Sequence, residues 1–361
     1  MTTLGTSLWP RLAELPLRID AARFERLALD FSPDMERVTT QIHLLGSGME
    51  GVGEDICPYA EEHEALREAG PSLPLAGEWT LEALSEHLAT VEQWPSPPAW
   101  EAARRYRNWA FESAALDLAL RQAGRPLHEL LGRPEPRPVR FVNSLGLGEP
   151  PSTDTIHRRL AQCPGLRFKL DAHPAWTPDL IAELAATGAV DAIDFKGHYG
   201  EEIEDPEALV SLYDHVLDAL PDALLEDPHD LPEVTARLAS RLERVSYDAP
   251  VHEARALDAL PLAAGRVNVK PSRVGSLRAL FELYAHCEAW GLGMYGGGMG
   301  ELGVGRGQVQ LLAAVFHPDA PNDVAPGGWN LAEPPAGLPS GPLVPSPRPT
   351  GLRWAAGPAR D

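Results

Sequence analysis

Short apolar runs that end in charged residues recur between residues 166 and 301. The runs are Arg167-Phe-Lys169-Leu-Asp171, Ala192-Ile-Asp194-Phe-Lys196, Leu224-Leu-Glu226-Asp227, Val245-Ser-Tyr-Asp248 and Val267-Asn-Val-Lys270. Most are followed by a helical stretch, and the unit returns at intervals of roughly 20–35 residues, the pattern of a parallel β/α barrel. In such barrels the carboxyl ends of the strands build the active site. The pattern therefore predicts a (β/α)8-like TIM barrel whose charged strand ends carry the chemistry.

The first third of the chain has a different pattern. Residues 15–30 and 36–46 alternate like strands, whereas residues 80–92 and 98–122 have the periodicity of helices. We therefore expect an α+β capping domain over residues 1–135 and the barrel over residues 136–324. The tail, residues 325–361, is rich in Pro and Gly but keeps several apolar side chains, so we expect it to pack back on the capping domain and complete it.

Composition narrows the classes of partner. The chain has 361 residues, of which 44% are hydrophobic and 23% charged, as in ordinary globular proteins. Its formal charge of −21 argues against nucleic acid or an anionic membrane as a partner, because both attract basic surfaces. We expect a small molecule as the ligand and a homo-oligomer as the assembly.

Cysteine usage and the N-terminus indicate the compartment. The three cysteines, Cys57, Cys163 and Cys287, are scattered without a CxxC spacing, which fits a reducing environment. The N-terminal residues lack a basic segment followed by an apolar run, so no signal peptide is evident. No apolar run approaches the ~20 residues that span a bilayer. We expect a cytoplasmic protein.

Four motifs, in order, resemble those of one family. They are Gly51-Val-Gly-Glu54, the segment from Trp109 to Gly132, Asn268-Val-Lys270-Pro-Ser-Arg273 and the glycine-rich segment from Gly293 to Glu301. Together they resemble the enolase superfamily, specifically its muconate-lactonizing (muconate cycloisomerase) branch, over nearly the whole chain. The resemblance implies removal of a proton α to a carboxylate, with Mg²⁺ holding the enediolate that forms.

By this resemblance, Asp194, Glu226 and Asp248 are the metal ligands. They end three successive strands, and Mg²⁺ takes oxygen ligands in an octahedron, half of which three carboxylates can supply. The alternative is that acids beside Pro228 and Pro250 only form turns.

The resemblance also assigns candidate acid and base groups. Lys270, at the sixth strand end, would face the metal across the substrate as a general base. Glu301 stands among glycines and would donate or relay a proton; alternatively, it is an acid at the start of the next helix. Loops of the capping domain around Asp34 and Tyr59 would cover the barrel mouth and set specificity.

Two strand ends depart from the family pattern. Lys169-Leu-Asp171 stands where the family usually has Lys-x-Lys, and Asp194-Phe-Lys196 stands where it usually has Asp-x-Asn. Residues i and i+2 share one face of a strand, so the lysine lost from the second strand returns beside it on the third. Either Lys196 takes over the acid/base role, or it pairs with Asp171 or Asp194 and partly replaces the metal.

The sequence thus predicts a Mg²⁺-dependent lyase or isomerase that acts on a small carboxylate by dehydration, cycloisomerisation or epimerisation. Lys270 and either Lys169 or Lys196 would flank the substrate, with Asp171 and Glu301 as further catalytic candidates. Epimerisation needs a base on each face, so Asp171 in place of a lysine favours a one-base reaction unless Lys196 substitutes. The alternative is a non-catalytic small-molecule-binding protein of the same fold, its metal site collapsed into lysine–carboxylate pairs.

Overall fold

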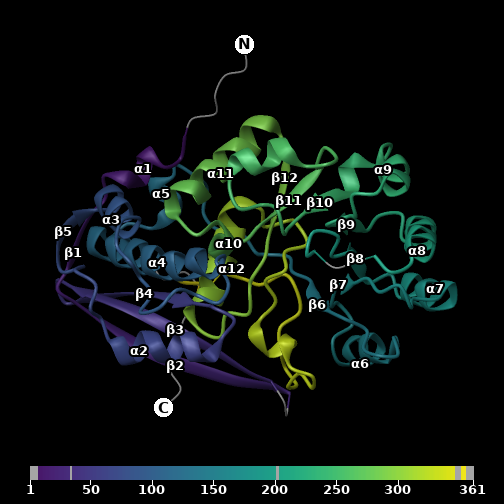
Figure 1. The fold of residues 1–361 in the computed structure, drawn as a ribbon, viewed down its shortest axis with the longest axis horizontal. Coiled ribbons are helices and arrows are strands. Elements are labelled where there is room, and N and C mark those ends of the chain that lie inside the picture. Colours follow the sequence, from purple (N-terminus) through teal and green to yellow (C-terminus); the bar gives the residue numbers. More distant parts are fainter. Residues whose placement is uncertain (1–6, 33–34, 201–202, 346–350, 355–361) are drawn as a thin grey trace.

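The computed structural model describes residues 7–32, 35–200, 203–345 and 351–354. They form an α+β capping domain and a β/α barrel (Figure 1), with the barrel helices α6–α9 on the side far from the cap strands. Asp34, one of the expected cap-loop residues, and both chain ends lie outside these ranges. Within them, no helix is long and apolar enough to cross a membrane.

Antiparallel strands form the outer layer of the capping domain. A three-stranded sheet has the order β2-β3-β4, and a two-stranded sheet pairs β1 with β5. Their bounds are β1 Pro16–Ile19, β2 Ala21–Ser32, β3 Met35–Gly46, β4 Met49–Asp55 and β5 Gly77–Thr80. A two-residue turn joins β3 to β4, and Ser47 and Gly48 both have positive φ, 51° and 72°. That turn geometry matches the twist of paired strands.

The long helix of the cap lies between this sheet and the barrel. The cap helices are α1 Pro10–Ala13, α2 Ala60–Ala69, α3 Leu81–Leu88, α4 Ala103–Ala123 and α5 Leu127–Leu130. The helix predicted over residues 98–122 is α4, and it is buried along most of its length because layers cover it on both sides. Glycines let β4 approach it closely, since a Cβ on Gly53 would lie 1.9 Å from Ala110 O. The left-handed Gly124 ends the helix.

Seven parallel strands form most of the barrel wall, in the order β12-β11-β10-β9-β8-β7-β6. Their bounds are β6 Asn143–Leu145, β7 Phe168–Asp171, β8 Val190–Asp194, β9 Leu224–Glu226, β10 Val245–Tyr247, β11 Arg266–Val269 and β12 Gly293–Gly296. The first of these strands, β6, is short, and the residues before it pair elsewhere: Val139 and Phe141 make isolated bridges with Leu343 and Asn322.

A two-residue segment closes the wall. Asn322 bridges Phe141 beside β6, and Asp323 bridges Gly297 beside β12, both in parallel orientation. Val142 N donates to Asn322 O at 2.8 Å, and Asp323 N donates to Gly296 O at 2.7 Å. The (β/α)8-like fold is confirmed, with its eighth strand reduced to these bridges.

Helices surround the outside of the barrel. They are α6 Asp154–Gln162, α7 Pro178–Ala186, α8 Pro206–Ala219, α9 Pro232–Leu238, α10 Pro271–Val274, α11 Leu277–Trp290 and α12 Val304–Phe316, with short 3-10 turns at Leu242–Arg244 and Ala254–Ala259. Several begin at a capping side chain. Thr177, Asp205 and Ser276 each accept a hydrogen bond from a backbone N–H in the first turn of α7, α8 and α11. These caps fix where each barrel helix begins.

The tail packs first on the barrel and then on the cap. A 3-10 turn, Gly327–Asn330, places the carbonyl oxygen of Trp329 where Arg159 Nη1 on α6 donates to it at 2.7 Å. Further on, Leu352 N and Arg353 Nε each donate to Asp117 of α4 at 2.7 Å. The tail therefore contacts both domains.

Candidate active site at the barrel mouth

The carboxyl ends of β7, β8 and β9 bring three predicted site residues to one level. Asp171 on β7 pairs in register with Asp194 on β8, which pairs in register with Glu226 on β9. Asp248 and Lys270 directly follow β10 and β11. Parallel strands end on the same side of the sheet, so these charged groups share the mouth of the barrel.

Lys169 lies beneath this level, between two carboxylates. Its Nζ donates a hydrogen bond to Glu226 Oε1 and lies 3.1 Å from Asp194 Oδ2. The side chain is 2% exposed. Burial disfavours its charged form, but the carboxylates of Glu226 and Asp194 outweigh burial and raise the pKa of Lys169 well above its usual value. Lys169 is therefore held as an ammonium ion.

Lys196 reaches the cluster from a loop, which corrects the expectation that it lies on the strand face of Asp194. Strand β8 ends at Asp194, and Lys196 has a left-handed backbone with φ 56°. Its backbone N donates to Asp194 Oδ1 at 3.1 Å, and its Nζ donates to Asp194 Oδ2 at 2.5 Å. The same Nζ lies 3.1 Å from Asp171 Oδ1. The loop wraps the lysine around the carboxylate of its own strand end.

Asp248 is held by three donors. Lys270 Nζ donates to its Oδ2 at 2.7 Å, Tyr199 OH donates to the same oxygen at 3.2 Å, and Arg273 Nη1 donates to Oδ1. Burial alone would raise the pKa of Asp248, but the cations of Arg273 and Lys270 outweigh it and lower that pKa. Asp248 is therefore a stable anion.

Glu226 is fully buried at the floor of the cluster. Tyr295 of β12 donates to its Oε2 and lies 3.0 Å from Ser246 Oγ. Burial raises the pKa of Glu226, and the ammonium of Lys169 offsets this only partly. The next acid, Asp227, has a left-handed backbone and accepts hydrogen bonds from the N–H groups of Asp248 and Ala249. Asp227 thus has the turn-forming role that was the alternative for acids beside proline.

The three expected metal ligands converge, but their oxygens already have partners. Each of the six oxygens of Asp194, Glu226 and Asp248 accepts a hydrogen bond from a side chain or backbone N–H of the protein. Among the described residues, no group of three or more His, Cys, Asp or Glu side chains is arranged to hold a metal ion. The donor types suit Mg²⁺, but as arranged they do not fit it, because lysine and arginine groups stand between them.

Glu301 lies beside this cluster and pairs elsewhere. Its Oε1 accepts a hydrogen bond from Met299 N at 2.8 Å, and its Oε2 lies 3.2 Å from Arg306 Nη2. In the described part of the chain it forms no ion pair with Lys169, Lys196 or Lys270. Neither does it cap α12, whose N-cap is Gly303.

A cap residue, Glu54, binds the start of α12 instead. Its carboxylate accepts hydrogen bonds from Leu302 N at 2.6 Å and from Gly305 N at 2.9 Å. The Gly51-Val-Gly-Glu54 motif therefore places a buried carboxyl group against the positive end of a barrel helix. Tyr59, the described member of the expected cap-loop pair, precedes α2 and is exposed.

Two features of the mouth were missed in reading the motifs. Arg273 and Tyr199 complete the environment of Asp248, and Tyr295 completes that of Glu226.

The distribution of lysine in the sequence marks the cluster as a whole. The chain has only three lysines among its 31 basic residues, and these are Lys169, Lys196 and Lys270. Every lysine of the protein therefore lies at the barrel mouth.

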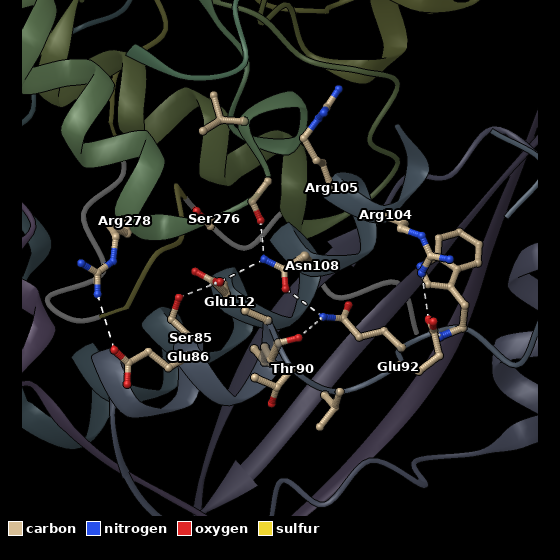
Figure 2. A pocket seen from close by; sticks show the side chains of 17 residues that line it. Ser85, Glu86, Thr90, Glu92, Arg104, Arg105, Asn108, Glu112, Ser276 and Arg278 are labelled. Carbon is tan, nitrogen blue, oxygen red and sulfur yellow. Dashed lines mark hydrogen bonds and ion pairs between the residues drawn. The ribbon is translucent and has the colours of Figure 1, made fainter. Parts of the chain in front are cut away.

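A separate pocket of about 650 Å³ lies between the cap and the barrel (Figure 2), lined by residues of α3 and α4, the segment between them and the start of α11. The buried Glu112 of α4 accepts hydrogen bonds there from Asn108, Ser85 and the backbone N of Leu277. None of the predicted site residues lines this pocket. Its polar contacts join the two domains.

Comparison with known proteins agrees with this architecture. An N-succinylamino acid racemase from Thermus thermophilus is 28% identical over 326 residues, which cover 87% of this chain and 84% of the racemase. A dipeptide epimerase from Enterococcus faecalis has a TM-score of 0.69 at 16% identity, covering 93% of this chain and 99% of that one. The muconate lactonizing enzyme from Pseudomonas putida has a TM-score of 0.65 at 18% identity, and the match covers 93% of this chain and 96% of that one.

These matches and the fold define an enzyme of the enolase superfamily, in its muconate-lactonizing branch. The N-succinylamino acid racemase among these relatives supports isomerase chemistry of that superfamily. The chain belongs to the family described as domain of unknown function DUF8230, whose N-terminal domain matches residues 10–130 and whose C-terminal domain matches residues 135–331.

Proposed function

We propose that this protein is an isomerase that removes the proton α to the carboxylate of a small acid and returns a proton to the same carbon skeleton. The observation that carries the proposal is the convergence of all three lysines at the barrel mouth, on strand ends that face one another. Lys270 comes from β11, whereas Lys169 and Lys196 come from β7 and the loop after β8. A substrate between them would meet Lys270 on one side and the side chains of Lys169 and Lys196 on the other.

Removal of a proton α to a carboxylate adds negative charge to a group that is already an anion. Fixed positive charge in a site that excludes water is an effective way to stabilise such an enediolate. In our proposal, Lys196 and Lys169 hold the substrate carboxylate. Lys270 separates from Asp248 Oδ2, 2.7 Å away, releases one ammonium proton to solvent, and its neutral amine then takes the α proton of the substrate. The reaction is general base catalysis by a positioned lysine.

The class of substrate follows from the relatives. The racemase from Thermus thermophilus is named for N-succinylamino acids, and the epimerase from Enterococcus faecalis for dipeptides. Both names describe an amino acid acylated on its nitrogen. We therefore place N-acylated amino acids first among the substrates and lactone-forming diacids second.

Exchange of the α proton with solvent tests this function directly. The protein would be incubated in D₂O with N-succinylamino acids, dipeptides and diacids, and loss of the α-proton signal followed by NMR. We expect exchange with at least one class, and none with a Lys270→Met variant. If no acid exchanges while one binds, the alternative of a non-catalytic binding protein holds. The full pairing of the carboxylate oxygens is the observation that favours that alternative.

The compartment and assembly stay predictions. Three free, buried cysteines support a reducing cytoplasm. Cell fractionation and a light-scattering mass would test the cytoplasmic location and the homo-oligomer.

A further inference from the structure

We infer that the ammonium groups of Lys169 and Lys196 occupy the place of a divalent cation, so that the folded protein neither holds Mg²⁺ at the barrel mouth nor needs it there. The inference rests on the proposed function only in taking the mouth as the active site. It replaces the sequence-based expectation of a magnesium enzyme, and it assigns the cation's role to residues of the chain itself.

The first support is the sharing of a single oxygen. Asp194 Oδ2 lies 2.5 Å from Lys196 Nζ and 3.1 Å from Lys169 Nζ. A Mg²⁺ ion bound through this carboxylate would sit about 2.0–2.1 Å from its oxygen. Two positive groups already approach that oxygen, and both would repel the ion strongly in a site of low dielectric constant.

The second support is the state of the other oxygens. Glu226 has Lys169 on Oε1 and Tyr295 on Oε2, so each of its oxygens already accepts a hydrogen bond. Asp248 is likewise occupied on both oxygens by Arg273 and Lys270. Binding a metal ion through these groups would require several buried hydrogen bonds to break together.

The third support is the positive charge already at the mouth. Four cations, Lys169, Lys196, Lys270 and Arg273, pair there with the carboxylates of Asp171, Asp194, Glu226, Asp248 and Asp323. Asp194 and Glu226 have no exposed surface, so a divalent cation placed among these four cations would meet a repulsion that solvent screens little.

The ammonium groups also cannot withdraw easily. Lys169 is enclosed, with 2% of its side chain exposed, and no other lysine occurs in the chain to replace it. Lys196 is 34% exposed and lies at the rim with Asp171. It is the ammonium that an entering carboxylate reaches first, and the substrate anion can take the position of Asp171 beside it.

The scarcity of lysine makes a sharp experiment possible. Protein labelled with ¹³C at lysine Cε gives signals from three residues, all of them at the mouth. After chelator treatment, Mg²⁺ would be added to about 10 mM while these signals are recorded and heats are measured by calorimetry. We expect no saturable shift of any signal and no one-to-one binding heat. A saturable shift of the Lys169 and Lys196 signals, with stoichiometric heat, would overturn the inference.

A double variant, Lys169→Met with Lys196→Met, completes the test. Loss of both ammonium groups leaves the carboxylates of Asp194 and Glu226 without their cations, so Mg²⁺ should now bind and raise the thermal unfolding midpoint by several degrees. A folded double variant that binds no Mg²⁺, and whose unfolding midpoint Mg²⁺ does not change, would show that the lysines do not take the place of a cation. If the variant does not fold, the Mg²⁺ titration of the wild-type protein, followed by the lysine signals and by calorimetry, is by itself the test of the inference. The exchange assay for the proposed function is separate, so magnesium binding with normal exchange would refute only this inference.

Discussion

The carboxylate of Glu54, on the last strand of the cap sheet, accepts a hydrogen bond at 2.9 Å from the backbone N of Gly305, in the first turn of α12. The residues are 251 positions apart. Glycine is needed at the contact, since a Cβ on Gly305 would lie 3.0 Å from Glu54 Oε2 and 2.9 Å from the side chain of Glu301. One buried carboxyl group therefore fixes the cap to the loop beside the barrel mouth.

Glu54→Ala should weaken this junction severely. The change removes the acceptor of the buried N–H of Gly305 and of the partly buried N–H groups of Leu302 and Gly303, and loss of a buried hydrogen-bond partner costs about 1–3 kcal/mol. We expect the free energy of unfolding to fall by about 3 kcal/mol or more, measured by chemical denaturation. Glu50→Ala, on the same strand but with a partly exposed side chain, is the control and should cost under about 1 kcal/mol.

Lys270→Met should remove catalysis and keep the fold. Loss of a positioned acid/base group typically lowers rates by about 10²–10⁴-fold, so we expect at least a hundredfold slower α-proton exchange. Circular dichroism would show that the variant is folded. Arg255→Met removes a cation whose side chain is 83% exposed and should leave exchange unchanged. Normal turnover by the Lys270 variant would reject this lysine as the base.

Lys196→Met and Asp171→Asn should differ in their effects. Asp171 is 39% exposed, and its pairing with Lys196 is worth at most about 1 kcal/mol. Lys196 also pairs with the fully buried Asp194, so its loss should cost about 2 kcal/mol and raise the KM at least tenfold. Exchange through Lys270 should continue in both variants. If Lys196→Met instead abolishes exchange on one face of the substrate only, Lys196 is a second base.

Much of this arrangement was predictable from the sequence because strands carry a local signal. Apolar runs that end in Asp194, Glu226 and Lys270 are strand ends in the structure, and the long run over residues 98–122 is the buried α4. Strand order then places the charged ends together. The lysine missing from the second strand end and the additional lysine just after the third were visible in the same way.

Other parts depend on contacts that leave no local pattern. The eighth strand is two residues, Asn322 and Asp323, in a Pro-rich loop, and only their partners identify them. The left-handed backbone of Lys196 carries its ammonium around Asp194, which strand alternation cannot anticipate. Whether lysines or a metal ion fill the space between carboxylates depends on the reach of long side chains in three dimensions. Sequence order could not decide it.

The last prediction concerns the segment that closes the barrel. His317 Nδ1 lies 2.7 Å from Asn322 Oδ1, and that oxygen also accepts a hydrogen bond from Gly296 N. The ring nitrogen is therefore the donor, and Nε2 faces Tyr284 OH at 3.4 Å. Burial disfavours the charged ring and lowers the pKa of His317 to about 4, against 6.5 for an exposed ring.

The sign of the pH effect follows from this lowered pKa. Between pH 6.5 and about 4, the unfolded chain binds a proton at His317 that the folded chain does not, so folding loses stability as the pH falls through this window. The loss attributable to this ring is about 3 kcal/mol and is complete near pH 4. The free energy of unfolding should fall between pH 7 and pH 4 in both proteins. This fall should be about 3 kcal/mol smaller in His317→Gln than in the wild type. His173→Gln, at an exposed position, should behave as the wild type. Equal pH dependence of wild type and His317→Gln would show that this ring is not the acid-sensitive element of the closure.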